Sequence, residues 1–277
     1  DERVISPMSA IFVNILMVSG LIVMFDMQHL HRVRNGRVCL VFGCILLHLA
    51  VIYFVSIFAP ATESDVSYTL LMLPYAFAPL VNSVLLGRLS GMFTTYVVTM
   101  LGGLLAPAGY GMEYMVLSLI TGVAVVILTK QVRRRGSLLR AGFYAGVAVL
   151  VLGVIFELIQ IPVDSVAFQE MMKKALGALG VSLLIAMIVS GILPALESLF
   201  GITTDISWLE MSDLNHKLLR QMQLEAPGTF HHSLIVASLA EAAAEEVGAN
   251  ATMCRVCAYF HDIGKLKKPT YFIENQG

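Results

Sequence analysis

The chain has 277 residues, of which 57% are hydrophobic and only 13% are charged, and its formal net charge is −1. Soluble domains usually carry about 25% charged residues, so this composition excludes an ordinary soluble enzyme, a secreted disulfide scaffold and a disordered protein. With 18 basic and 19 acidic residues, the chain has no overall excess of positive charge that would bind a nucleic-acid polymer.

Apolar stretches dominate the chain before residue 200. A membrane-spanning helix needs about 20 mostly apolar residues. We therefore expect an all-α fold with a seven-helix transmembrane bundle, whose spans cover residues 7–25, 38–60, 66–86, 89–107, 112–128, 139–161 and 175–196. Pro74 and Pro79 predict a kink in the third span.

The loops between these spans alternate in charge. Basic residues gather in the first, third and fifth loops: Arg32, Arg34, Arg37, Arg88, Lys130, Arg133, Arg134 and Arg135, with Arg140 just beyond. An excess of Lys and Arg marks the cytoplasmic side of a membrane. The pattern predicts a multi-pass protein of the cell (inner) membrane with its N-terminus outside and its C-terminal segment in the cytoplasm.

Four polar residues stand out inside the predicted spans: Asn14, His48, Asn82 and Glu157. Such groups are costly in a membrane and are therefore functional candidates. We interpret His48 as a hydrogen-bonding partner of a neighbouring helix, and Glu157 as a residue near the outer end that reaches water.

Residues 201–225 are amphipathic and predict one helix that joins a membrane region (1–200) to a cytoplasmic segment (226–277). Apolar side chains recur there at helical spacing: Trp208, Met211, Leu214, Leu218 and Met222. The helix is either a passive linker or a signal-carrying, dimer-forming element.

The cytoplasmic segment predicts two successive helices. Thr229 is expected to cap the first, which ends at Gly248, and the second runs from near Asn250 to the pair His261 and Asp262. Helix cannot continue beyond Pro269.

These two helices carry residues suited to phosphate-ester hydrolysis. The carboxylate of Asp262 has two oxygen atoms and can bridge two metal ions, which in hydrolases lie about 3.5–4 Å apart. His261 would bind one ion through its neutral imidazole, and His232 or His231 would complete that side. Lys265 would neutralise a phosphate oxygen. Taken singly, each residue has a plainer interpretation: a helix cap for the histidines and a basic cluster near anionic lipid for the lysines.

Two sequence motifs resemble a known family. The stretch Glu225-Ala-Pro-Gly-Thr-Phe-His-His-Ser233 and the motif His261-Asp-Ile-Gly-Lys265 resemble the HD superfamily of phosphohydrolases. The following Lys267-Lys-Pro-Thr-Tyr-Phe-Ile-Glu-Asn-Gln276, and Asp213-Leu-Asn-His216 before the domain, are similar to the membrane-anchored 7TM-HD family.

The resemblance implies a metal-dependent phosphodiesterase that hydrolyses cyclic di-AMP to the linear dinucleotide pApA. It implies two divalent transition metals, manganese or iron, with His232, His261 and the bridging Asp262 as ligands and with Asp262 and Lys265 in the catalytic site. His232 is preferred to His231 because it stands next to Ser233. No metal role is assigned to Glu274, Asn275 or Gln276.

The family supplies further His and Asp ligands downstream, whereas this sequence stops at Gly277. We therefore expect a fragment whose remaining ligands follow Gly277 and which does not hydrolyse the nucleotide alone. The expected partners are a cyclic dinucleotide, the lipid bilayer and, in a homodimer, a second copy of the chain. The alternative function is a transmembrane receptor whose HD segment relays a signal without catalysis.

Overall fold

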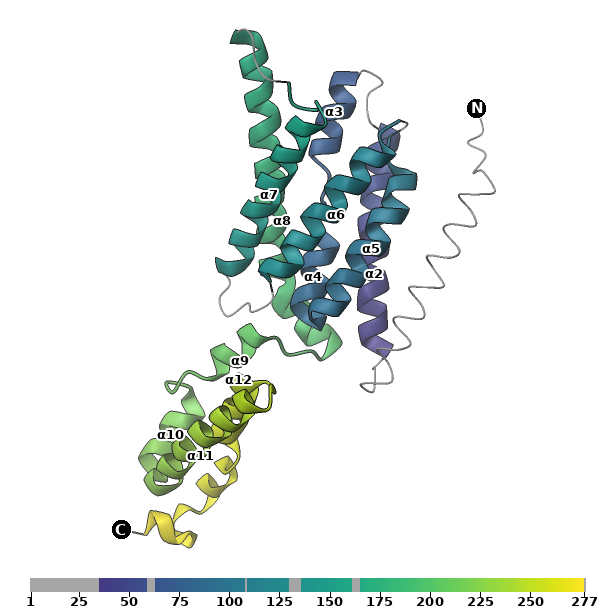
Figure 1. The fold of residues 1–277 in the computed structure, drawn as a ribbon. Coiled ribbons are helices and arrows are strands. Elements are labelled where there is room, and N and C mark those ends of the chain that lie inside the picture. Colours follow the sequence, from purple (N-terminus) through teal and green to yellow (C-terminus); the bar gives the residue numbers. More distant parts are fainter. Residues whose placement is uncertain (1–34, 59–62, 108, 130–135, 161–164, 277) are drawn as a thin grey trace. The chain divides into compact units, whose positions relative to one another are not determined.

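The computed structural model describes residues 35–58, 63–107, 109–129, 136–160 and 165–276 (Figure 1). The chain divides into two compact units, an N-terminal unit that ends at Ile202 and a C-terminal unit that begins at Thr203. Every regular element within the described ranges is a helix, as the sequence predicts.

The N-terminal unit is a bundle of helices. Their bounds are α2 (Asn35–Phe58), α3 (Glu63–Leu71), α4 (Phe77–Leu86), α5 (Arg88–Leu105), α6 (Gly111–Leu128), α7 (Gly136–Ile155) and α8 (Ser165–Phe200). Helix α5 packs against α4 and α6, and α7 packs against α6 and α8 (Figure 1).

Among the described residues, four helices are long and apolar enough to cross a membrane: Gly36–Phe58 within α2, then α6, α7 and α8. The first predicted span, residues 7–25, lies outside the described residues. Helix α8 has 36 residues and begins well before the predicted span 175–196. Helix α5 also has 18 residues but is not among these four.

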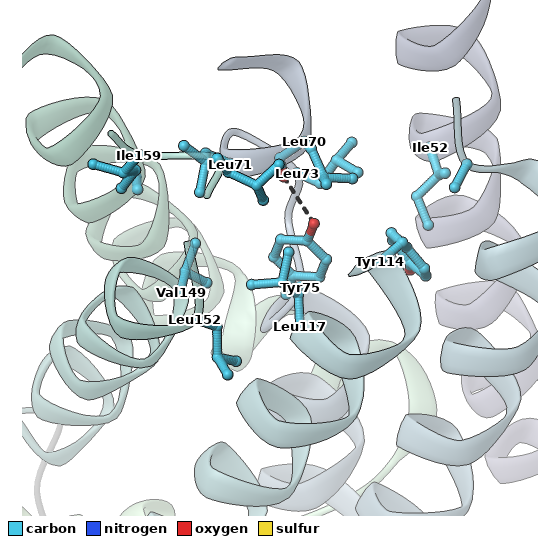
Figure 2. Packing of buried hydrophobic residues seen from close by; sticks show 13 residues of the cluster. Ile52, Leu70, Leu71, Leu73, Tyr75, Tyr114, Leu117, Val149, Leu152 and Ile159 are labelled. Carbon is cyan, nitrogen blue, oxygen red and sulfur yellow. Dashed lines mark hydrogen bonds between the residues drawn. The ribbon is translucent and has the colours of Figure 1, made fainter. Parts of the chain in front are cut away.

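The third predicted span is not one kinked helix. Residues 66–86 form the separate helices α3 and α4, and Pro74 lies in the break between them. Proline has no backbone N–H to donate, and its ring clashes with the preceding turn of a helix. The hydroxyl of Tyr75, within the break, donates to the carbonyl oxygen of Leu70 in α3 at 2.8 Å (Figure 2). This hydrogen bond ties the break to the end of α3. This region therefore forms two short helices instead of one continuous helix.

Figure 2 shows the apolar core that joins these helices around Tyr75 and Tyr114. The two aromatic rings lie 5.4 Å apart between centroids, and both side chains are buried. Gly102 of α5 makes room for Tyr114, because a Cβ there would come within 2.6 Å of the tyrosine ring. The buried Nε2 of His48 on α2 lies 3.5 Å from the Tyr114 hydroxyl on α6, in agreement with a partner on a neighbouring helix. Glu157 is exposed beyond the end of α7.

Hydroxyl and amide side chains join α4, α5 and α6. Asn82 donates to Thr94 at 2.9 Å, and Thr99 donates to Ser118 at 3.0 Å. Buried polar groups need such partners because water is absent from the bilayer core. The polar residues of α5 therefore pack against other helices of the bundle.

The C-terminal unit is built from seven short helical elements. They are α9 (Asp205–Met211), α10 (Lys217–Glu225), α11 (Pro227–Glu246), α12 (Ala251–Phe260) and the 3₁₀ turns η1 (Ile263–Lys267), η2 (Pro269–Tyr271) and η3 (Ile273–Asn275). Gly248, at φ +68°, follows the C-cap of α11, and Asn250 caps α12 by accepting from the N–H of Met253. These two boundaries lie where the sequence predicts them.

The predicted helix over 201–225 is wrong as a single element, since α9 and α10 are separate. The backbone N–H of Asn215 donates to the carboxylate of Asp213 at 2.9 Å, and the ring of His216 accepts from Leu218 N–H to cap α10. Such local side-chain bonds offer the backbone an alternative to continuing the helix. The amphipathic pattern predicts the helical faces but misses the turn between them.

Helices α10, α11 and α12 share one apolar core. It is formed by Leu219 and Met222 of α10, Phe230 and Ala237 of α11, and Ala258 and Tyr259 of α12. At the surface, Arg255 of α12 donates to the carboxylate of Glu241 on α11 at 3.0 Å. This packing aligns α11 and α12 along each other and sets the positions of the side chains at their ends.

Candidate metal centre

The candidate centre lies where the first turns of α11 approach the end of α12. His232 is exposed on α11, while Phe230 and Ser233 on either side of it are buried in the unit. His261 is the C-cap residue of α12, and Asp262 follows it at the start of η1. The burial of one face of α11 thus directs His232 to the surface beside the end of α12.

Three predicted site residues come together there. One ligand atom each from His232, His261 and Asp262 lies within 4.8 Å of the other two. The two imidazole rings are 5.5 Å apart between centroids, and Nε2 of His261 lies 3.5 Å from Oδ2 of Asp262. His231 is not part of this group. Among the described residues, His232, His261 and Asp262 are the group of His, Cys, Asp or Glu side chains close enough to hold a metal ion together.

A hydrogen bond orients the imidazole of His261. Its Nδ1 lies 2.7 Å from the carbonyl oxygen of Ala258. A carbonyl can only accept, so Nδ1 is the donor; in the neutral imidazole, Nε2 then carries the lone pair. This is the arrangement by which metal-binding histidines are held in the right tautomer and orientation.

Lys265 is held between two carboxylates at the edge of the group. Its Nζ donates to Oδ2 of Asp262 and to Oε1 of Glu274, both at 2.7 Å. It also lies 4.9 Å from the centroid of the Phe272 ring. Hydrogen bonds to Asp262 and then to Glu274 raise the pKa of Lys265 above its ordinary value, so the ammonium is charged beside the predicted metal site.

The end of the described chain folds back onto the first turn of α11. The N–H of Thr229 donates to Oδ1 of Asn275 at 3.0 Å, and Nδ2 of Asn275 donates to the Thr229 hydroxyl at 2.9 Å. The prediction that Thr229 caps α11 is therefore wrong, because Thr229 lies inside the helix and the N-cap is Ala226. A residue 46 positions away in the sequence binds the free N–H group.

Glu274 and Asn275 are thus site-supporting residues that the sequence interpretation missed. Glu274 accepts from Lys265 and also from the Thr229 hydroxyl, at 3.3 Å. The residues after Pro269 give no local sequence signal that Glu274 and Asn275 contact Thr229. The one signal available is Gly228, whose lack of a side chain permits a close approach to the backbone of Glu274.

Comparison with known protein families decides the identity of the chain. Residues 5–204 match the model of the 7TM receptor with intracellular HD hydrolase, and residues 229–277 match the model of the HD domain. The chain belongs to the family of 7TM receptors with an intracellular HD hydrolase. It is a multi-pass membrane protein with the beginning of an HD hydrolase domain.

Characterised relatives of this 7TM-HD chain are phosphodiesterases. It is 29% identical over its whole length to the cyclic-di-AMP phosphodiesterase PgpH of Bacillus subtilis, covering 39% of that protein. It is also 29% identical to PgpH of Listeria monocytogenes, over 88% of this chain and 34% of that protein. An uncharacterized protein of Synechocystis is 48% identical over 86 residues, which are 31% of this chain and 11% of that protein. The chain thus spans well under half the length of these relatives. No solved structure matches it.

The donor set of this 7TM-HD protein fits a divalent transition metal. HD hydrolase domains depend on metals, and two imidazoles with one carboxylate form the donor set that binds Fe(II) in other proteins and leaves positions open. In its neutral form, each of the two imidazoles offers one nitrogen lone pair to a metal. Two ions need more donors than these three residues supply.

We expect acid to release the end of the described chain in the metal-free protein. The hydrogen bond from Lys265 lowers the pKa of Glu274 below its ordinary value of 4.5. A carboxylate with a depressed folded pKa stabilises the fold above its unfolded pKa, and this stabilisation is lost as the pH falls through the folded pKa. Amide hydrogen exchange of residues 269–276, corrected for its intrinsic pH dependence, should therefore show weakening protection as the pH falls below 4.5.

The matched control for this experiment is Glu274→Gln, which keeps the shape of the side chain and removes its titration. Its protection should show less pH dependence than that of the natural protein. Equal pH dependence in the two proteins would contradict the role given to the Glu274 carboxylate.

Proposed function

We propose that the intact protein is a membrane-bound, metal-dependent phosphodiesterase that hydrolyses cyclic di-AMP to pApA. The observation that carries this proposal is the convergence of His232, His261 and Asp262 within 4.8 Å, at the junction of two helices in an HD domain. The substrate is proposed from the two PgpH relatives, which are cyclic-di-AMP phosphodiesterases. The proposed ligand is thus a cyclic dinucleotide and not a nucleic-acid polymer.

Each residue of the centre has a role that its geometry supports. A ring nitrogen of His232, Nε2 of His261 and the carboxylate of Asp262 would hold the metal, with Asp262 bridging two ions. When bound, two divalent ions of manganese or iron would polarise a phosphoryl oxygen and activate a water molecule. Lys265 would contact a phosphate oxygen, because its ammonium lies 2.7 Å from Asp262 at the rim of the group. Water would then open one phosphodiester bond, and the linear product pApA would leave.

We propose that the membrane region, residues 1–200, spans the bilayer seven times, with the N-terminus outside and the HD segment 226–277 in the cytoplasm. The match to a seven-span receptor family and the basic loops support this topology. Residues 201–225 would connect the two parts. The membrane region would anchor the enzyme or sense a signal for it, and a homodimer is the proposed assembly.

The proposed function is tested on the intact natural protein, reconstituted in lipid with Mn²⁺ or Fe²⁺. Cyclic di-AMP should be converted to pApA, and a chelator should stop the reaction. Absence of pApA with the intact, metal-loaded protein, or hydrolysis that persists in the chelator, would refute the proposal.

A further inference from the structure

The ammonium of Lys265 shares an oxygen atom with the candidate metal. Oδ2 of Asp262 accepts from Lys265 at 2.7 Å and lies 3.5 Å from Nε2 of His261. A cation bound by His261 and Asp262 would meet Lys265 at the same carboxylate. Like charges repel, so metal binding at this carboxylate disfavours the ion pair between Asp262 and Lys265.

When a metal binds Asp262, Glu274 remains as the second carboxylate that Lys265 can contact. Its Oε1 lies 2.7 Å from Nζ of Lys265, as close as the oxygen of Asp262. Glu274 is outside the group of three ligand residues. Its carboxylate therefore remains available to Lys265 when the carboxylate of Asp262 is taken by a metal.

Glu274 is itself held in place by the backbone around it. Asn275 binds both the N–H and the hydroxyl of Thr229, and the same hydroxyl donates to Glu274. Gly228 allows this approach, because a Cβ there would overlap the carbonyl oxygen of Glu274. Thr229 lies one turn before His232 on α11, so the Glu274 carboxylate is tied to the helix that carries one ligand and to the lysine beside another.

We propose that Glu274 is a positioning residue of the metal centre, which draws Lys265 away from the Asp262 oxygen and keeps it at the rim of the site. The inference rests on the proposed function, since it takes His232, His261 and Asp262 as metal ligands. Glu274 acts through Lys265 and does not itself touch the metal. Its carboxylate charge strengthens metal binding by removing a competing ammonium from Asp262.

The test is a double-mutant cycle on the intact protein, read out as the dissociation constant for Mn²⁺ in the absence of nucleotide. Glu274→Gln should weaken Mn²⁺ binding by about 10-fold, as expected for a residue that orients a metal ligand. Lys265→Ala removes the competing cation, so Glu274→Gln added to it should change the affinity by less than about 2-fold. Glu274→Asp should restore much of the binding, since it restores the charge.

The matched control is Glu246→Gln, which removes the charge of an exposed carboxylate at the far end of α11 and should leave Mn²⁺ binding unchanged. An equal Mn²⁺ affinity in the natural protein and Glu274→Gln would overturn the inference. So would a loss from Glu274→Gln that is the same with and without Lys265, because support independent of the lysine gives additive effects.

The metal readout also separates this inference from the proposed function. The Mn²⁺ affinities could change as predicted for the double-mutant cycle while the protein does not hydrolyse cyclic di-AMP. That result would refute the proposed substrate and support the role of Glu274. Failure of the natural protein to bind either Mn²⁺ or Fe²⁺ would refute both.

Discussion

Replacing Asp262 with Asn should abolish hydrolysis of cyclic di-AMP by the intact protein. The substitution keeps the size of the side chain but removes the charge that faces both His261 and Lys265. Changing residues that only orient a metal ligand costs about 10–100-fold in affinity or activity, so loss of a bridging ligand should exceed about 100-fold. The rate of pApA formation and the metal content per chain are the two measurements.

A control with the same chemical change is Glu245→Gln, at an exposed position of α11 far from the centre in sequence. It should retain the activity and metal content of the natural protein. Hydrolysis that survives Asp262→Asn at the natural rate would show that the assignment of the metal centre is wrong.

The second large effect is expected from Gly228→Ala. A Cβ at this position would overlap the carbonyl oxygen of Glu274 and would lie 2.5 Å from its carbonyl carbon and 3.2 Å from Oδ1 of Asn275. Backbone atoms cannot rotate out of the way as the end of a side chain can. Overpacking of this kind costs about 1–3 kcal/mol, which exceeds the gain of about 1 kcal/mol from replacing glycine in a helix.

Hydrogen exchange in the intact protein measures this change directly. The free energy of opening of residues 269–276 should fall by about 1–3 kcal/mol in Gly228→Ala, and the rate of hydrolysis should fall with it. Gly180→Ala is the control, since Gly180 is also helical but has open space around its Cβ position. Unchanged protection in Gly228→Ala would contradict the packing of η3 against α11.

The helices of the candidate site could be predicted because their signals are local. Gly248 ends α11, Asn250 begins α12, and His261 with Asp262 follows directly from the end of α12. The all-α fold follows in the same way from apolar stretches long enough for helices. A pattern that repeats every few residues is enough to place such elements.

The features that could not be predicted depend on contacts between distant residues or on competition between local ones. Asn275 binds Thr229 across 46 positions, and no neighbouring residue indicates this. The turn at Asp213 interrupts a pattern that remains amphipathic on both sides, and Pro74 predicts a kink but not the division of residues 66–86 into two helices. Periodicity reports which face of a helix is apolar, but it does not report where backbone hydrogen bonds are exchanged for side-chain ones.

Anomalous diffraction from crystals of the Mn²⁺-loaded intact protein would show whether side chains from α11 and from the end of α12 bind one metal ion together. We predict a manganese peak within about 2.5 Å of Nε2 of His261, a ring nitrogen of His232 and a carboxylate oxygen of Asp262. Manganese bound elsewhere, with the imidazole of His232 turned away from His261 and Asp262, would contradict this prediction.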